Sequence, residues 1–433
     1  MSPHMLLVLF GSALFTFLEF YLLFMNVYLF GISTAGLRRR PEHKILVPLK
    51  SFALIVPAHN EEHVIAETVK SLRDIDYPKE LFQVLVVADN CSDTTEERAR
   101  KAGAQVLVRT NDTHRGKPHA VRAGMEHALA TDRPDAVVIV DADNVVSRNL
   151  LMEFNSRLLQ GEKVIQAYLD SKNPDDSWVA SMYAISYWIL ARFIQLAPAQ
   201  LGLPCQLGGT GYCIETETLE RYGWDVTSLT DDLEYTMRVV LNDITPTWAH
   251  DAVVYDEKPL TMKASLRQRL RWMQGHWDVA TRYTGPLLRK AFRERDPGAF
   301  HCAIYCLGPT RTILWGITLV FIWLPIFAPD VTSLAIHPMP GAWLGIVLSS
   351  FFLLYPLLIL ALEHVPPRFF SRFALMFIFQ PTWIPVAWLG LFRRKKQNWA
   401  KTEHTRTVTV TDAERNRGRK PAPEPVSSDS RAA

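Results

Sequence analysis

The sequence predicts an α/β domain, built on a mainly parallel sheet, with transmembrane helices before and after it. In residues 50–259, short apolar runs rich in β-branched residues alternate with helix-like polar stretches. This alternation is typical of strand–helix–strand units in a parallel sheet that is covered on both faces. Residues 1–37 and 300–392 instead contain apolar runs near or above the roughly 20 residues that span a bilayer.

The composition excludes several classes of protein. The chain has 433 residues, of which 48% are hydrophobic and 21% charged, so it can bury a large core and is not disordered as a whole. Its 47 basic and 44 acidic residues leave a net charge of +3, and we expect no nucleic-acid partner from so weak a bias. Five scattered cysteines argue against a disulfide framework.

The expected elements follow in order along the central domain. The expected strands are Phe52–Pro57, Gln83–Ala88, Gln105–Val108, Ala136–Val140 and Val164–Tyr168. The expected helices are Glu61–Leu72, Thr94–Ala102, Pro118–Ala130 and Arg148–Leu159. Because ligands gather at the carboxyl ends of parallel strands, the residues that follow these strands are the first candidates for a site.

The N-terminal apolar run, Met5–Phe30, is followed by the basic cluster Arg38-Arg39-Arg40. A cleaved signal peptide has its basic residues before a shorter apolar core. We therefore expect residues 1–37 to form an uncleaved transmembrane anchor whose C-terminal side is cytosolic.

The C-terminal membrane region, residues 300–392, contains three apolar segments. They are Thr312–Phe327, Ala342–Leu362 and Phe373–Phe392. The third contains Pro381 and Pro385, so we expect it to be broken, re-entrant or interfacial rather than a full crossing. That arrangement keeps the basic run Arg393–Lys396 in the cytosol, together with a polar tail, residues 393–433, that we expect to be disordered.

Polar residues follow four of the expected strands. They lie in Pro57-Ala58-His59-Asn60-Glu61, at Asp89, in Arg115-Gly116-Lys117 and in Asp141-Ala142-Asp143. An aspartate at the end of a parallel strand can accept hydrogen bonds from a nucleoside, and a cation beside a glycine suits a phosphate. Two carboxylates two residues apart suit Mg²⁺ that is shared with substrate phosphates. Taken singly, each motif is also explained as a helix cap, a solvated loop or an acidic turn.

Two further motifs lie C-terminal to these. Thr230-Asp231-Asp232 places adjacent acids before an expected helix, where one of them can be a general base or merely a cap. Gln268-x-x-Arg271-Trp272 lies in a basic and aromatic stretch, and we expect residues 260–299 to form an interfacial helix region. The apolar stretch Val179–Leu196 is either another interfacial helix or a core helix.

Four of these motifs, in their order along the chain, resemble those of the membrane-bound family 2 glycosyltransferases, the group of the cellulose, chitin-oligosaccharide, hyaluronan and poly-N-acetylglucosamine synthases. They are Asp89, Asp141-x-Asp143, Thr230-Asp231-Asp232 and Gln268-x-x-Arg271-Trp272. The resemblance covers residues 50–285 and the flanking membrane segments. It implies a GT-A fold over residues 50–259, a Rossmann-like α/β arrangement with a mainly parallel sheet. It also implies a hexosyltransferase that uses a UDP-sugar.

The resemblance assigns roles to individual residues. Donor binding falls to Pro57, Ala58, His59, Glu61, Asp89, Lys117, Asp141, Gln268, Arg271 and Trp272. Asp143 would hold Mg²⁺ or Mn²⁺, and Asp232 would be the catalytic base. The commoner Thr-Glu-Asp reads Thr-Asp-Asp here, which keeps the base and leaves the catalytic role of Asp231 open.

These assignments imply an inverting membrane glycosyltransferase that moves N-acetylglucosamine or glucose to a growing β-linked glycan. The alternative is transfer of a single sugar to a lipid acceptor such as ceramide or another membrane lipid. The expected partners are thus a UDP-sugar, a glycan or lipid acceptor and the bilayer, and an oligomer is left open. We expect an integral protein of the cell (inner) membrane with a cytosolic catalytic domain.

Overall fold

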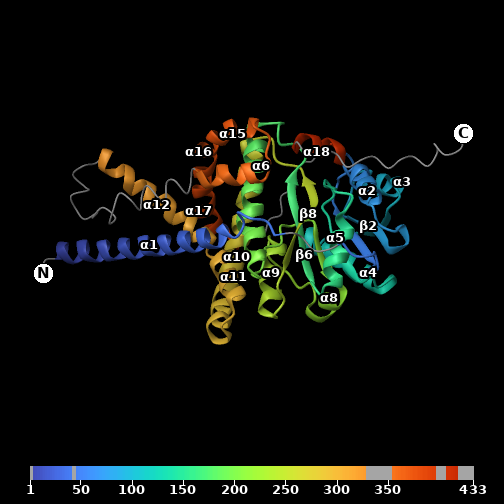
Figure 1. The fold of residues 1–433 in the computed structure, drawn as a ribbon, viewed down its shortest axis with the longest axis horizontal. Helices are drawn as coiled ribbons and strands as arrows, with labels where there is room; N and C mark the ends of the chain where they lie inside the picture. Colours follow the sequence, from blue (N-terminus) through green and yellow to red (C-terminus); the bar gives the residue numbers. More distant parts are fainter. Residues whose placement is uncertain (1–2, 41–44, 328–353, 396–405, 418–433) are drawn as a thin grey trace, which may run out of the picture.

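A computed structural model describes residues 3–40, 45–327, 354–395 and 406–417 of the chain. A sheet domain lies at one side, and a layer of long helices stands beside it (Figure 1). Two helices, α1 (Pro3–Thr34) and α12 (Gly308–Phe327), extend away from this layer on the side opposite the sheet.

The sheet has eight strands in the order β3-β2-β1-β4-β7-β6-β8-β5. They are β1 (Phe52–Ala58), β2 (Phe82–Asp89), β3 (Gln105–Arg109), β4 (Ala136–Ile139), β5 (Val145–Val146), β6 (Val164–Ser171), β7 (Tyr212–Glu215) and β8 (Thr247–Asp256). Strands β1 to β4 are parallel, and β6 and β8 are also parallel. The mainly parallel α/β fold is therefore confirmed.

The antiparallel strand β7 was not expected from the sequence. It pairs with β4 on one side and with β6 on the other, and β5 pairs antiparallel with β8. Strands β5 and β7 have only two and four residues, which is too short for a periodic signal. Strand β7 brings the loop before it, which contains Gly209 and Thr210, to the carboxyl end of β4.

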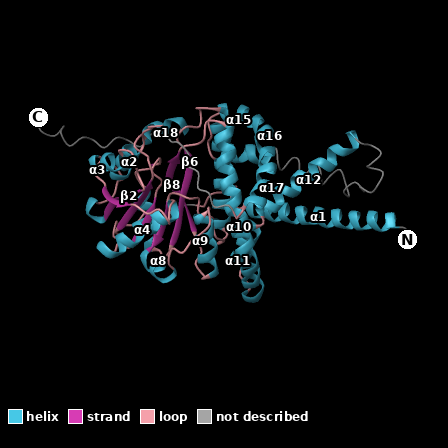
Figure 2. Ribbon diagram, turned by 180° about the vertical axis from the view of Figure 1, so that it is seen from behind, coloured by secondary structure: helices cyan, strands magenta, loops and turns pink. Residues whose placement is uncertain are grey.

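Helices cover both faces of the sheet (Figure 2). They are α2 (Ile65–Arg73), α3 (Thr95–Lys101), α4 (Lys117–Thr131), α5 (Leu150–Leu159), α8 (Thr216–Tyr222) and α9 (Asp231–Leu241), with a short 3₁₀ turn η1 (Lys79–Leu81). Alternate residues of β1 face opposite sides: Leu54 packs with α2, α3 and α5, whereas Ile55 packs with α4, α8 and α9. Gly124 lets α4 approach the sheet, since a Cβ there would lie 2.5 Å from Cγ2 of Ile55.

The helical layer beside the sheet begins with the apolar stretch that the sequence left undecided. It comprises α6 (Trp178–Leu190), the π-helical turn η2 (Ala191–Leu196) and α7 (Ala197–Gln200). Trp178–Gln200 is long and apolar enough to cross a bilayer, but 67% of its most apolar window is buried inside the protein. Trp188 is fully buried against β6, so this segment is mainly a core helix.

Two more helices, α10 (Met262–Glu294) and α11 (Pro297–Cys306), complete the layer. The C-terminal segment packs first against α6 and then against α10. Its elements are α15 (Arg368–Arg372), η3 (Phe373–Leu375), α16 (Met376–Phe379), η4 (Gln380–Thr382) and α17 (Trp383–Arg393). Helix α17 lies close to α10: Trp277 Nε1 donates to the Ala387 carbonyl (2.9 Å), and a Cβ on Gly390 would meet Met273.

The expected membrane segments have different outcomes. Thr16–Thr34 of α1 and Arg368–Arg393 are long and apolar enough to cross a membrane, and Thr312–Phe327 lies within α12. The last segment contains a short 3₁₀ turn at Pro381, and its expected broken, re-entrant or interfacial placement stays a prediction. Most of Ala342–Leu362 lies outside the described residues, and 354–362 are helical. The actual crossings remain predictions.

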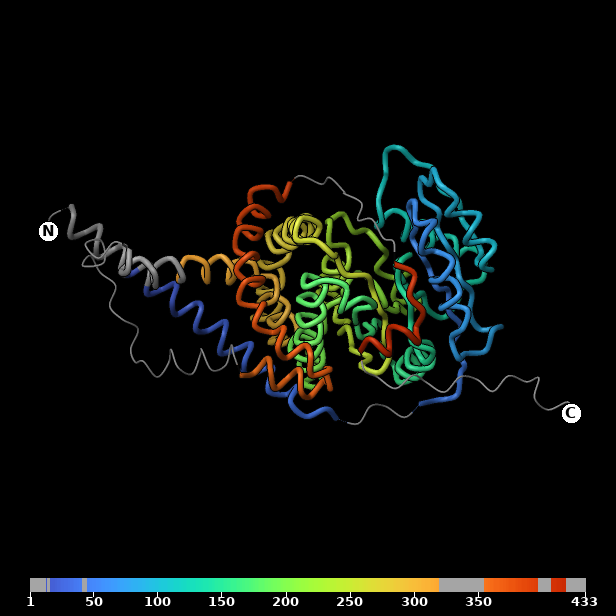
Figure 3. Tube along the Cα trace, turned by 90° about the horizontal axis from the view of Figure 1, so that it is seen from above, coloured from blue at the N-terminus to red at the C-terminus, as the bar shows by residue number. Residues whose placement is uncertain are grey.

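The tail, residues 393–433, was expected to be disordered, and for residues 406–417 this expectation is wrong. They pack against the sheet domain and end in helix α18 (Val410–Arg417), which is red in Figure 3. Arg417 is buried and pairs with Asp170 at the end of β6 (2.9 Å). No sequence pattern predicted this helix, because its stability comes from contacts with distant residues.

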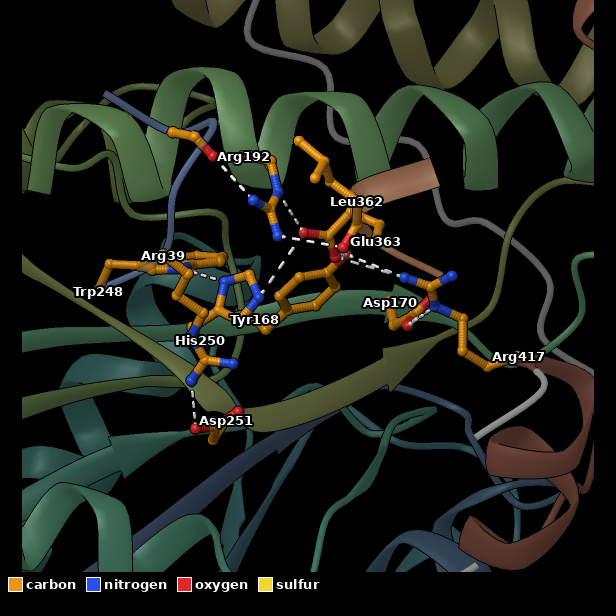
Figure 4. Close-up of polar contacts among 11 residues, drawn as sticks. Arg39, Tyr168, Asp170, Arg192, Trp248, His250, Asp251, Leu362, Glu363 and Arg417 are labelled. Carbon is orange, nitrogen blue, oxygen red and sulfur yellow. Dashed lines mark hydrogen bonds and ion pairs between the residues drawn. The ribbon is translucent and has the colours of Figure 1, made fainter. Parts of the chain in front are cut away.

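A buried ionic network joins these distant segments (Figure 4). Glu363 accepts hydrogen bonds from Nε of Arg192 (2.7 Å) and from the hydroxyl of Tyr168 (2.9 Å), and Arg417 reaches the same carboxylate (3.5 Å). Arg192 also donates to the carbonyl of Gly36, just after α1 (2.8 Å). The network therefore connects five parts of the chain: the end of the anchor, the core helix, the sheet, the segment that contains Glu363, and the tail.

Candidate active site

One large cavity opens at the carboxyl ends of β1, β2 and β4. Its volume is about 2070 Å³, roughly twice the upper end of the usual range for single-ligand pockets, so it has room for a nucleotide sugar and an acceptor. Every residue to which we assigned a site role lines it: Pro57, Ala58, His59, Glu61, Asp89, Lys117, Asp141, Asp143, Asp231, Asp232, Gln268, Arg271 and Trp272. The site thus brings together residues that are far apart in the sequence: Pro57 and Trp272 are separated by 215 positions.

The first wall comes from the ends of β1 and β2. These strands are parallel and pair Ala58 with Ala88, so His59 and Asp89 leave the sheet together. A ring nitrogen of His59, Nδ1, lies 2.8 Å from the Asp89 carbonyl oxygen. The Asp89 carboxylate forms an ion pair with Arg109, its register partner on β3. Arg109 is not among the expected site residues, although its position at the end of β3 is a signal for such a role.

The second wall centres on Asp141 and Lys117. Lys117 is the first residue of α4, and its Nζ lies 2.5 Å from Oδ1 of Asp141 and 2.6 Å from the Gly209 carbonyl oxygen. Burial alone would lower the pKa of Lys117, but Asp141 and the acids at 231 and 232 raise it. Lys117 is therefore a fixed cation that is held among three carboxylates.

Asp143 lies beyond Asp141 and is buried at the cavity wall. Its carbonyl oxygen accepts a hydrogen bond from Nζ of Lys172 (2.7 Å), and its Oδ2 accepts one from the backbone N–H of Glu257 (3.3 Å). Lys172 also donates to the carbonyl of Arg406 in the tail (2.8 Å). The tail therefore contacts Lys172, the side chain that is hydrogen-bonded to the expected metal ligand Asp143. No sequence motif indicated this contact.

Asp231 and Asp232 form the first turn of α9. Oδ1 of Asp232 accepts a hydrogen bond from the N–H of Leu233 (2.8 Å), whereas Oδ2 of Asp231 is buried without a hydrogen-bond partner among the described residues. Burial, reinforced by the Asp231 carboxylate, raises the pKa of Asp232 to about 7. Burial also raises the pKa of Asp231, against the effect of Lys117. A carboxylate with a pKa near 7 suits proton transfer at neutral pH.

Helix α10 closes the cavity beside these acids. Gly275 packs directly against Thr230, because a Cβ there would lie only 2.7 Å from the Thr230 nitrogen. Nη1 of Arg271 donates to the Leu229 carbonyl (3.2 Å), which places the guanidinium at the edge of the acidic turn. Trp272 stacks with Trp383 of α17 at 6.5 Å between ring centroids and an interplanar angle of 17°.

Beyond Trp272 the cavity continues between the helices. His276 and Tyr305 stack at 5.4 Å, and burial lowers the pKa of His276 to about 4, so its ring is neutral. Further lining side chains come from α1, α6, η2, α12, residues 355–356 and the C-terminal segment. They are mostly apolar: Leu29, Ile189, Leu190, Phe193, Ile194, Trp315, Pro356, Phe373, Met376, Phe377 and Ile384.

Comparison with known families gives one match that covers more than half of the chain. Residues 48–275 match the family described as "Glycosyltransferase like family 2". A solved structure, the mannosyltransferase PcManGT from Pyrobaculum calidifontis in complex with GDP-Man and Mn²⁺, has a TM-score of 0.57 at 15% identity. The match covers 88% of this chain and all of that one, and it shows a shared GT-A fold.

Curated relatives have low identity. A probable glycosyltransferase of Bacillus subtilis, YdaM, is 26% identical over 54% of this chain and 57% of its own length. A beta-monoglucosyldiacylglycerol synthase of Nostoc is 26% identical over 66% of this chain and 64% of its own length. A poly-beta-1,6-N-acetyl-D-glucosamine synthase of Staphylococcus epidermidis is 22% identical over 62% and 67%. The chain thus spans about three fifths of the first two of these relatives.

Proposed function

The chain belongs to the glycosyltransferase like family 2, and from that premise we propose that it transfers a sugar from a UDP-sugar, with inversion, to a hydroxyl of a membrane lipid. One observation supports this acceptor: the cavity with the expected donor residues continues between helices that line it with mostly apolar side chains. Acyl chains need no hydrogen-bond partners, whereas the hydroxyls of a glycan need many. A lipid fits this half of the cavity better than the growing glycan that we expected from the sequence.

The apolar half of the cavity also has side chains that reach the outer surface. Leu190 and Phe377 both line it, and they are 42% and 63% exposed. A lipid could therefore enter sideways from the bilayer without leaving an apolar environment. The relatives named as N-acetylglucosamine or glucosyl-lipid synthases favour N-acetylglucosamine or glucose as the sugar.

The chemistry follows from the charges at the strand ends. Lys117 and Arg271 would hold the diphosphate, while His59 and Asp89 would lie at the nucleoside. Asp232 would take the proton of the acceptor hydroxyl as that oxygen attacks the anomeric carbon. The bond from this carbon to the diphosphate breaks, and its electron pair leaves with UDP, where the two cations stabilise the new charge.

A divalent cation, Mg²⁺ or Mn²⁺, fits the donor set at Asp143 and Asp141. Among the described residues there is no group of three or more His, Cys, Asp or Glu side chains that could hold a metal ion. The protein would thus supply one or two carboxylates and the donor phosphates the remaining ligands, as is usual for Mg²⁺. When bound, the cation would offset negative charge on the leaving diphosphate.

The expected location stays part of this proposal. The basic cluster Arg38-Arg39-Arg40 follows α1 and supports a catalytic domain on the cytosolic side of the cell (inner) membrane. In that orientation, the donor half of the cavity faces the cytosol and its apolar half faces the bilayer.

A second acceptor, the growing β-linked glycan, is favoured by a different observation. The stacked rings of Trp272 and Trp383 line the cavity and offer flat faces to a sugar ring. One relative is also named as a poly-N-acetylglucosamine synthase.

The test is a product assay on membrane vesicles that contain the full chain. The vesicles receive Mn²⁺ and a panel of radiolabelled UDP-sugars, and products are separated into organic-soluble lipid and aqueous glycan. We expect the label in the lipid fraction. Label in a large glycan that a linkage-specific hydrolase digests would establish the second acceptor instead.

A further inference from the structure

An arginine lies in the apolar half of the cavity, far from the expected donor groups in the sequence. Arg311 is in the first turn of α12 and lines the cavity. This turn is fixed to the anchor helix, because the hydroxyls of Tyr21 and Thr310 are hydrogen-bonded (2.6 Å). Its place in the cavity is continuous with the active site: a Cβ on Gly308 would lie 3.7 Å from Cε1 of His276, one turn after Trp272 in α10.

Within the part of the chain that the structure describes, the half-buried Arg311 differs from two buried arginines that have acidic partners. Arg192 pairs with Glu363 (2.7 Å) and Arg417 with Asp170 (2.9 Å). None of the described residues forms an ion pair or a hydrogen bond with the guanidinium of Arg311. An unpaired cation among apolar side chains is costly, and in a membrane segment it most often marks a ligand site.

Further polar groups that line the cavity suit an anion with attached hydroxyls. Asn26 of α1 lines the cavity, and its Oδ1 is buried without a hydrogen-bond partner among the described residues. Thr312 and Thr318 also line it. The first turn of α12 adds the positive end of the helix dipole, which favours an anion.

We propose that the acceptor is an anionic lipid, whose phosphate binds Arg311 while its free hydroxyl reaches Asp232. This inference rests on the proposed function and narrows its acceptor class. A guanidinium binds a phosphate through two parallel hydrogen bonds, which a neutral lipid cannot offer. In the transfer, the phosphate stays intact: the lipid hydroxyl gains the glycosyl group, its proton goes to Asp232, and UDP leaves with the electron pair of the broken bond.

The experiment compares two lipid acceptors that differ in this phosphate. The full chain is reconstituted into vesicles that contain either phosphatidylglycerol or diacylglycerol, both of which have a free hydroxyl. Transfer from the UDP-sugar is measured for each, and glycerophosphoglycerol serves as the same headgroup without acyl chains. We expect phosphatidylglycerol to be the better acceptor and the water-soluble headgroup to be poor, since it lacks the chains that the apolar walls bind.

The Arg311→Gln variant then tests the residue. It should lower the ratio of kcat/KM for phosphatidylglycerol to that for diacylglycerol by about 10- to 100-fold, the usual effect of a charged hydrogen bond. Arg311→Lys should have an intermediate ratio, since lysine keeps the positive charge but lacks the two parallel N–H groups of the guanidinium. Arg289→Gln, at an exposed position of α10 outside the cavity, is the matched control and should leave the ratio unchanged.

Every other outcome contradicts the inference that the acceptor is an anionic lipid. An unchanged ratio in Arg311→Gln, equal use of both lipids by the wild type, or efficient use of the soluble headgroup overturns this inference and leaves the proposed function intact. Label in glycan alone overturns it as well. If the wild type turns over no UDP-sugar at all, the proposed function fails and the acceptor inference with it. UDP binding, measured by calorimetry, checks that each variant is folded.

Discussion

Arg417, the last residue of α18, forms a buried ion pair with Asp170 at the end of β6, with 2.9 Å between Nε and Oδ2 (Figure 4). The guanidinium also lies over the ring of Trp188, 4.4 Å from its centroid, and Nε1 of Trp188 donates to the other oxygen of Asp170 (2.6 Å). A residue near the C-terminus therefore completes the core between the sheet and the helical layer.

Removal of this pair should destabilise the whole protein. Arg417→Met leaves the Asp170 charge buried without its cation, and we expect a loss of about 3–5 kcal/mol in the free energy of unfolding. Arg415→Met is the control, because the side chain of Arg415 is 68% exposed, and its effect should stay within about 0.5 kcal/mol. Thermal unfolding in detergent measures both. Equal melting temperatures for the two variants would show that α18 does not stabilise the fold.

The second prediction concerns the catalytic base. Asp232→Asn should lower kcat by about 10²- to 10⁴-fold, because the amide cannot accept the acceptor's proton. UDP binding, measured by calorimetry, should be retained, since Asp232 is not expected to contact the nucleotide. Asp231→Asn is the comparison and tests the role that the sequence left open. Joint loss of UDP binding and activity in Asp232→Asn would mean that Asp232 is a structural acid.

The third prediction is a pH dependence with opposite signs for activity and stability. The pKa of Asp232 is raised from 3.8 to about 7 by burial and then by Asp231. The base works only when ionised, so kcat/KM should rise with pH up to about 7 and then level off. The contribution of Asp232 to stability has the other sign: it is present below about pH 4 and is lost as the pH rises through about 7. A flat rate profile between pH 5 and 8 would contradict the assignment.

The fourth prediction tests the contact of α10 with the acidic turn. In Gly275→Ala, the new Cβ would lie 2.7 Å from the Thr230 nitrogen, so the turn that contains Asp231 and Asp232 must shift. We expect a loss of about 1–3 kcal/mol in stability and, for a displacement near 1 Å, about 10²-fold in kcat. Gly31→Ala in α1, which would meet nothing within 4 Å, should change neither. An active and stable Gly275→Ala would show that the turn tolerates the shift.

The fifth prediction concerns the cation. Chelation should abolish transfer, and added Mn²⁺ or Mg²⁺ should restore it. Asp143→Asn should raise the concentration of Mn²⁺ for half-maximal activity by about 10-fold or more, since it removes a charged ligand. Asp74→Asn, at an exposed position away from the cavity, is the control. Titration of the ion in a kinetic assay distinguishes a shifted requirement for Mn²⁺ from a general loss of activity.

Local sequence patterns predicted the elements of the sheet domain, and the motifs predicted the family. Strands β1 to β4 and helices α2 to α5 were expected to within four residues at each boundary, because alternating β-branched and amphipathic runs reflect burial against one sheet. The polar residues at the strand ends could be selected because parallel strands end at one edge. For the same reason, the expected polar site residues that follow the strands line one cavity: His59, Glu61, Asp89, Lys117, Asp141 and Asp143. The expected residues of α9 and α10 line the same cavity: Asp231, Asp232, Gln268, Arg271 and Trp272.

Other features depend on contacts between residues that are far apart in the sequence. The short antiparallel strand β7 and helix α18 have no periodic signal of their own, and they form because β4 and β6, or Asp170 and Trp188, lie where they can pair. The raised pKa of Asp232 comes from burial that no motif encodes. The apolar extension of the cavity and the place of Arg311 within it likewise arise only when helices from both ends of the chain pack beside the sheet. The sequence thus selected the reactive groups, whereas packing determined their environment and the acceptor that this environment favours.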